Sequence, residues 1–221
     1  SNPTGTVYTK EEAEVIFEWA FKNNIWIISD ELYEHLVYEG EKTPSPAIYD
    51  PELKNTIVVN GVAKAYAMTG WRVGWIIAND EVISIAKKIQ SHATSNVSNL
   101  SQIAATSALQ NGLEETNIMK EAFNKRRLSA FDVFNNIDNI KIAKPNGAFY
   151  LFPDISYYCN NKIKNVSNSI EFCDWLLEEH YIAFIPGEVF GAEGYFRCSY
   201  ALSENELSEG LKRFTEAIKD L

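Results

Sequence analysis

The sequence predicts an α/β protein, with an α/β layer up to about residue 110 and a smaller α+β unit after it. Two observations support this fold class. In the first half, an amphipathic helix alternates with short apolar runs, which is typical of helices packed on a sheet. After residue 80, helical periodicity dominates, and strand-like runs return only from residue 140 of the 221 residues.

The first helix is predicted from the capping box Thr9-Lys10-Glu11-Glu12, which satisfies the free amides of a helix start. Apolar residues follow at helical spacing as far as Ala20, and the helix should end near Asn23. Residues 25–29 are an apolar run that predicts a strand buried on both faces, as in parallel sheets. Further strands are predicted at residues 56–60 and 72–78.

The rest of the chain is predicted to be mostly helical. Helices are expected at residues 83–89, 100–109, 119–137, 169–179 and 203–218, and strands at residues 140–143, 148–152 and 195–200. The Asn111-Gly112 pair should separate two helices. Lys125-Arg126-Arg127 is interpreted as the solvated face of the long helix. These elements predict two domains, of residues 1–110 and 111–221.

Composition excludes several classes of partner. Lysine and arginine total 20, aspartate and glutamate total 30, and the net charge is −10. This acidic total argues against general attraction to nucleic acid or to anionic lipid. No apolar run approaches the roughly 20 residues that a membrane helix needs, and the polar start of the chain does not resemble a signal peptide. Nucleic acid and membranes are therefore not expected as partners.

The cysteines and histidines predict neither a disulfide scaffold nor a metal site. Cys159, Cys173 and Cys198 are an odd set without CxxC spacing, so we expect reduced thiols and a cytoplasmic location. The three histidines lie far apart without the spacing of metal ligands, so no bound metal is expected.

Three polar residues near the predicted strands are candidates for chemistry. In α/β sheets, ligands bind at the carboxyl ends of strands, where Asp30 and Lys64 would emerge. Burial disfavours the charged ammonium, so Lys64 in its apolar stretch could supply a neutral nucleophile; the alternative is a lysine that reaches water from a loop. Arg72 could bind an anion or stack on a tryptophan, and Asp30 could simply cap a turn.

Six short segments occur in one order along essentially the whole chain. They are residues 2–5 (NPTG), 29–33 (SDELY), 60–72 (NGVAKAYAMTGWR), 145–150 (PNGAFY), 185–187 (IPG) and 195–200 (YFRCSY). Together they resemble the class I and II aminotransferases, which are fold type I enzymes that use pyridoxal phosphate. The run AYAMTGWR is most similar to the bacterial aspartate aminotransferase-like branch.

The resemblance implies roles for five residues toward the cofactor. Lys64 would bind the cofactor aldehyde as a Schiff base and then move the proton at the substrate Cα. Asp30 would pair with the pyridine nitrogen and keep the ring protonated, as an electron sink. Tyr33 and Asn2 would hydrogen-bond the phenolic oxygen, and Arg72 would bind the phosphate.

The resemblance also implies a site for an amino acid and a 2-oxo acid. Arg197 would bind the α-carboxylate bidentately, and Asn146 would lie beside the substrate. From the residues alone, an intramolecular salt bridge at Arg197 and a plain hairpin turn at Asn146 are the alternatives. The implied activity is amino-group transfer with an aspartate-like or aromatic amino acid, and a carbon–sulfur β-lyase of the same fold is the alternative.

Two features depart from the family pattern. Gly61 stands where many relatives carry a serine that can reach the cofactor phosphate. The chain is also roughly half as long as a family subunit, which implies the C-terminal portion of a fold type I transferase: part of the large domain, with its mixed, mostly parallel sheet, and the small α+β domain. Such a portion alone is expected to be a catalytically inactive fragment, and the full-length protein a homodimer.

Overall fold

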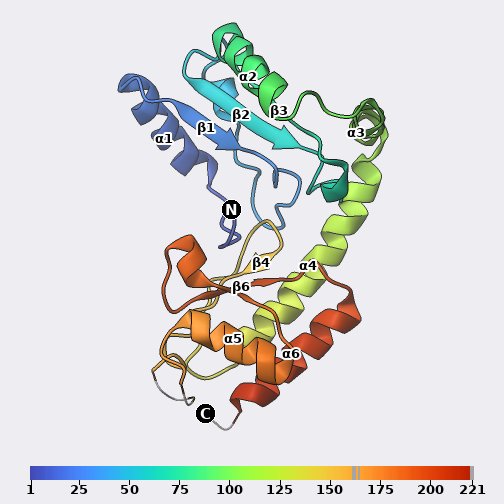
Figure 1. The fold of residues 1–221 in the computed structure, drawn as a ribbon. Helices are drawn as coiled ribbons and strands as arrows, with labels where there is room; N and C mark the ends of the chain where they lie inside the picture. Colours follow the sequence, from blue (N-terminus) through green and yellow to red (C-terminus); the bar gives the residue numbers. More distant parts are fainter. Residues whose placement is uncertain (161–162, 164, 220–221) are drawn as a thin grey trace. The chain divides into compact units, whose positions relative to one another are not determined.

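The computed structural model describes residues 1–160, 163 and 165–219, and the chain divides into two compact units. Val7–Lys120 form one, called here the sheet unit, and Ser1–Thr6 with Glu121–Leu221 form the other, the C-terminal unit (Figure 1). Helix α4 (Leu113–Asn135) contributes residues to both units. The assignment of residues 1–110 to a cofactor-binding domain stays a prediction.

The sheet unit begins with α1 (Lys10–Lys22), and both predicted ends of this helix are confirmed. The side chain of Thr9 accepts from the amide of Glu12, whose carboxylate accepts from the amide of Thr9 in return. The helix is capped at its other end by Asn23. Its buried face consists of Ala13, Phe17 and Ala20, three of the residues at helical spacing.

The sheet of this unit has three strands, β1 (Ile27–Asp30), β2 (Thr56–Gly61) and β3 (Gly74–Ile77), in the order β1-β2-β3. The first pair is parallel and the second antiparallel, so the sheet is mixed. The third strand begins two residues later than predicted. Arg72 has a left-handed backbone (φ 55°), which the extended conformation of a strand does not allow.

The prediction that residues 25–29 are buried on both faces is wrong. Exposure alternates along β1, and the Ile28 side chain is 69% exposed. A strand is buried on both faces only where other elements cover both faces of its sheet. Among the described residues, no element covers the face of β1 that carries Ile28.

Three helices follow the sheet as predicted: α2 (Asp80–Ala93), α3 (Asn99–Asn111) and α4. Gly112 caps α3, so the predicted break between the two helices is confirmed. None of the described helices is long and apolar enough to cross a membrane.

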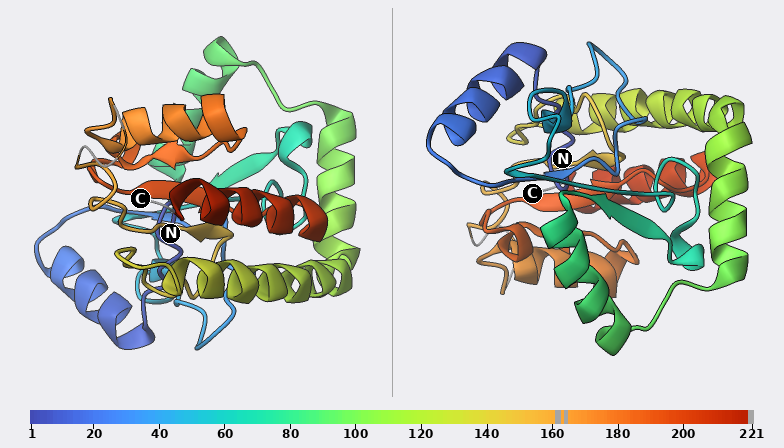
Figure 2. Two further views of the ribbon diagram at one scale, coloured as in Figure 1. Left: turned by 90° about the horizontal axis from the view of Figure 1, so that it is seen from below. Right: turned by 90° about the horizontal axis from the view of Figure 1, so that it is seen from above.

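The C-terminal unit has a second small sheet, with strand order β4-β6-β5 and antiparallel pairs throughout. Its strands are β4 (Tyr150–Leu151), β5 (Ile185–Pro186) and β6 (Phe196–Ser199). Helices α5 (Ser169–His180) and α6 (Glu204–Ile218) contact each other and can be followed in orange and red in Figure 2. The predicted capping box at Ser203 and Glu206 is confirmed.

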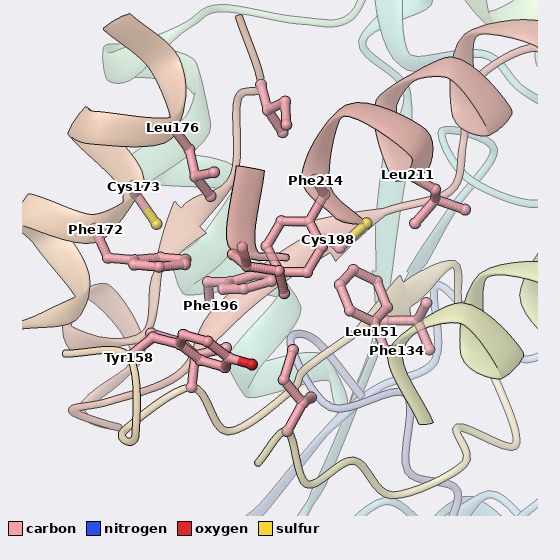
Figure 3. Close-up of a cluster of buried hydrophobic side chains, with 14 of the residues drawn as sticks. Phe134, Leu151, Tyr158, Phe172, Cys173, Leu176, Phe196, Cys198, Leu211 and Phe214 are labelled. Atoms are coloured by element: carbon pink, nitrogen blue, oxygen red, sulfur yellow. The ribbon is translucent and has the colours of Figure 1, made fainter. Parts of the chain in front are cut away.

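An aromatic core fills this unit (Figure 3). Phe196 on β6 stacks on Phe184 with ring centroids 4.3 Å apart, and Phe214 on α6 meets Phe134 on α4 at 5.2 Å. Cys198 lies in the same core. All three cysteines are free and buried, and burial raises the pKa of the Cys198 thiol to about 12.

Two predictions for this unit are wrong. Residues 140–143 do not form a strand, because only Lys141 makes a bridge, with Asp154. Arg127 is not on a solvated face of α4: its side chain is 1% exposed. Its Nη1 donates to the carbonyl of Pro145, which lies in a loop 18 residues further along the chain and contributes to its burial.

Candidate functional site

Four of the predicted site residues come together at one edge of the sheet unit. Asp30 is the last residue of β1, and Lys64 follows the end of β2 by three residues. Arg72 precedes the start of β3 by two residues. Because β1 and β2 are parallel and β3 is antiparallel to them, these positions lie at the same edge. Tyr33 lies in the turn directly after β1.

Lys64 is partly buried in a turn between Val62 and Ala65, which are both buried. Its Nζ lies 5.9 Å from the centroid of the Tyr33 ring, so the amine and the aromatic ring are neighbours. The turn contacts α4, where the fully buried hydroxyl of Thr116 lies 3.1 Å from the carbonyl of Ala65 and 2.8 Å from the carbonyl of Gly112 and shares its one proton between them. This contact links the turn that carries Lys64 to α4.

Replacing Thr116 with valine should lower the free energy of unfolding by about 1–2 kcal/mol. Valine keeps the shape but leaves the buried carbonyl of Ala65 without this donor. Urea denaturation measures the loss. The control is Thr106→Val on α3, whose exposed hydroxyl donates to the carbonyl of Gln102 and should matter little. Equal changes in both variants would show that Thr116 does not anchor the turn.

Asp30 is exposed, and its Oδ1 accepts from the amide of Leu32 over 3.1 Å. This contact is the turn cap that the residues alone allow as an alternative. The carboxylate is thereby oriented at the edge of the sheet, one residue beyond Ser29, whose hydroxyl donates to Glu31. Its role against a pyridine nitrogen stays a prediction.

Arg72 is exposed, and its Nη1 donates to the carbonyl of Thr69 over 3.0 Å. The other donors of the planar guanidinium suit an anion such as a phosphate. Gly61 has a steric reason to lack a side chain: a Cβ there would lie 2.9 Å from the carbonyl oxygen of Val73 and 3.1 Å from Cα of Gly74. A serine at this position would need the two strands to move apart.

Sequence reasoning missed a network beside Tyr33. The carboxylate of Glu34 pairs with Lys42 and accepts from Asn60 Nδ2 over 2.6 Å, and His35 lies 3.8 Å away. Partial burial alone would raise the pKa of Glu34. The hydrogen bonds from Lys42 and Asn60 outweigh it, so the pKa lies below its ordinary value of 4.5. The charged residues of this turn gave no indication in the sequence that Glu34 contacts Asn60 on β2.

This network should make stability depend on pH. Because the folded pKa of Glu34 is lowered, its contribution is fully present above 4.5 and is lost as pH falls through the folded value. Glu34→Gln should therefore flatten the acid limb of the unfolding free energy against pH. The control is Glu178→Gln on the exposed face of α5. An acid limb unchanged by the Glu34 substitution would contradict the assignment.

The C-terminal unit holds a second group of polar residues, centred on Arg197. Its Nη1 donates to Oδ1 of Asn2 over 2.8 Å. The guanidinium carbon lies 4.6 Å from the ring centroid of Tyr150 and 5.1 Å from that of Phe190, so two aromatic rings contact the guanidinium. The Nε atom is buried and has no hydrogen-bond partner among the described residues. No described carboxylate pairs with Arg197, so the salt-bridge alternative is not supported there.

The two remaining site predictions have different outcomes. Asn2 lies beside Arg197 in the C-terminal unit, whereas the other proposed cofactor residues lie in the sheet unit. Asn146 is exposed, and its backbone amide donates to the carbonyl of Gly5 over 3.0 Å. Tyr150 and Phe190 were missed, because aromatic residues in short strands and turns are more often read as core.

Residues 1–214 match the family described as aminotransferase class I and II. The chain belongs to this family. The resemblance read from the six segments is therefore confirmed.

Individual aminotransferases agree with this assignment. An aspartate aminotransferase of Streptomyces avermitilis is 45% identical over 223 residues, which cover 100% of the chain and 55% of the relative. An asparagine–oxo-acid transaminase of Streptococcus mutans is 40% identical over 214 residues, covering 96% of the chain and 54% of the relative. The chain thus spans about half the length of these curated aminotransferases.

The fold agrees as well. The crystal structure of an aromatic aminotransferase from Pyrococcus horikoshii matches with a TM-score of 0.90 and 34% identity, over 99% of this chain and 58% of that one. This match confirms the α/β fold class of an aminotransferase.

Proposed function

We propose that the protein containing this chain is a pyridoxal-phosphate-dependent aminotransferase, which moves an amino group between an amino acid and a 2-oxo acid. The observation that carries this proposal is the guanidinium of Arg197. It is fixed by Asn2 and two aromatic rings, and its buried Nε lacks a partner among the described residues. A carboxylate ligand would supply that partner in the bidentate geometry that arginine prefers.

The donor set of the sheet unit fits the cofactor. Lys64 offers an amine to an aldehyde, Asp30 a carboxylate to a protonated pyridine nitrogen, and Arg72 a guanidinium to a phosphate. Tyr33, whose ring lies 5.9 Å from the Lys64 amine, offers a phenol to an oxygen close to that aldehyde. Asn2 is the proposed second donor to this oxygen. When bound, the cofactor supplies an electron sink for the substrate carbanion.

This chain's own residues perform the other steps in the proposal. Arg197 binds the substrate α-carboxylate and orients Cα. The amine of Lys64 would take up the proton from the substrate Cα and later release it, which requires a mobile side chain on a fixed backbone. The Thr116 contact supplies that fixed backbone.

The substrate class is proposed from the relatives' names and from Arg197. The relatives act on aspartate, asparagine or aromatic amino acids, and we propose an aspartate-like or aromatic amino acid here. The cytoplasmic location, the homodimer and the place of this chain in the C-terminal portion of the subunit stay predictions.

A product assay on the protein expressed from its complete reading frame tests the proposal. Amino acid and 2-oxo acid pairs should exchange amino groups, with one new 2-oxo acid formed for each one consumed. A carbon–sulfur β-lyase would instead release pyruvate and ammonia from a β-substituted amino acid. Exclusive formation of pyruvate and ammonia would contradict amino-group transfer.

A further inference from the structure

Arg127 is a buried charge on α4 with directed contacts. Its side chain is 1% exposed, and burial of a guanidinium is costly unless its donors are satisfied. Its Nη1 donates to the carbonyl of Pro145 over 2.6 Å, and its Nε donates to Oδ1 of Asn124 over 3.0 Å. The neighbouring Lys125 is exposed, so burial is specific to position 127. The first contact fixes the start of the loop that contains Asn146.

This loop holds the beginning of the chain. The amides of Asn146 and Gly147 both donate to the carbonyl of Gly5, over 3.0 and 2.8 Å. Gly5 has a φ of +69°, and a Cβ on it would lie 2.3 Å from Cβ of Pro145. Only glycine satisfies both the backbone angle and this close approach. Gly5 is therefore seated directly on the loop that Arg127 anchors.

The same short segment carries Asn2. The amide of Gly5 donates to the carbonyl of Ser1 over 2.9 Å, which closes a turn around Asn2. Oδ1 of Asn2 accepts from Arg197 over 2.8 Å. A continuous path of contacts thus joins the buried guanidinium of α4 to the guanidinium on β6. We call it the Arg127–Arg197 path.

We propose that Arg127 is a positioning residue for the carboxylate-binding Arg197. It acts through the loop at Pro145, then Gly5 and Asn2, and touches no substrate itself. The inference rests on the proposed function, because it assigns Arg127 to the amino-acid site of that reaction. Loss of the anchor lets the turn around Asn2 shift and the fork of Arg197 rotate. A displacement of about 1 Å in a positioned group can cost roughly a hundredfold in rate.

The test uses the protein from its complete reading frame, with Arg127→Met, Arg127→Lys and the control Arg126→Met. Methionine removes the donors at position 127, and we expect the KM for the amino acid to rise roughly ten- to a hundredfold. Lysine can still donate to the Pro145 carbonyl and should recover part of this loss. Arg126 lies over the Phe123 ring on the same helix, so its loss should leave KM unchanged.

A second readout separates positioning from general damage. The dissociation constant of pyridoxal phosphate should rise much less than KM, because Asn2 is the one proposed cofactor residue on this path, whereas Lys64, Asp30 and Arg72 lie in the sheet unit. Gly5→Ala breaks the same path at its middle, where Gly5 is seated on the Pro145 loop, and should raise KM similarly. Combined with Arg127→Lys, it should add less than the sum of the two single effects.

The outcomes distinguish the inference from the function it depends on. Wild-type KM values in both Arg127→Met and Gly5→Ala overturn the inference, as does an equal loss of cofactor and amino-acid affinity. If Arg127→Met does not fold, Gly5→Ala and Arg127→Lys decide by the same KM criterion. A wild-type protein without amino-group transfer contradicts the proposed function instead.

Discussion

Lys64→Ala is expected to abolish amino-group transfer. The amine of Lys64 is the proposed nucleophile toward the cofactor and the proposed base at Cα, and alanine removes both groups at once. In another enzyme, removal of the catalytic nucleophile lowers kcat on the order of a millionfold. Turnover of the protein from the complete reading frame, followed by 2-oxo acid production, measures the effect.

A chemical readout supports this first prediction. Borohydride reduction in the presence of pyridoxal phosphate should fix a pyridoxyl group on Lys64, which peptide mass spectrometry locates. Lys54 is the matched control, because its exposed amine is paired with Glu52 over 2.8 Å and lies outside the proposed site. Lys54→Ala should keep full activity. A label found on a different lysine would remove the central assignment.

Asp30→Ala is expected to cost roughly a hundred- to a thousandfold in kcat, the loss seen when one preorganised electrostatic contact to a transition state is removed. The carboxylate is proposed to keep the pyridine nitrogen protonated, so the electron sink weakens without it. The borohydride label on Lys64 should persist, which separates the two roles.

Asp80→Ala is the control for this second prediction, since Asp80 is an exposed residue at the start of α2. Near-normal turnover of Asp30→Ala would contradict a role for the carboxylate in the reaction. Asp30 would then serve only as the turn cap that accepts from the amide of Leu32. Both variants should be compared at equal cofactor saturation, because Asp30 also contributes to affinity.

Local signals in the sequence predicted the elements that local physics determines. The capping boxes at Thr9 and Ser203 fix helix starts through contacts only three residues long, and both are present. The glycine at position 112 ends a helix in the same local way. The family segments name Lys64 and Arg197 as site residues, because each segment repeats a pattern of residue types in a fixed order; their roles stay predictions.

Contacts between distant segments could not be predicted in this way. Arg127 follows two other basic residues on a helix, a pattern typical of a solvated face, and only the Pro145 loop buries it. The position of Phe190 next to Arg197 likewise depends on β5 and β6 pairing in register. The exposure of Ile28 depends on what covers the sheet, which the strand's own residues do not encode.

The unequal packing of the two units affects how the chain responds to partial unfolding. The described core of the sheet unit around β2 includes a cluster of Val62, Met68 and Ala105, whereas aromatic rings interlock throughout the C-terminal unit. Opening free energies follow buried apolar contact, so amide hydrogens of β6 should exchange with solvent far more slowly than those of β1. In this chain, the backbone around Arg197 is therefore expected to open last, with the rest of the C-terminal unit. The turn that carries Lys64 belongs to the sheet unit, which should open more readily.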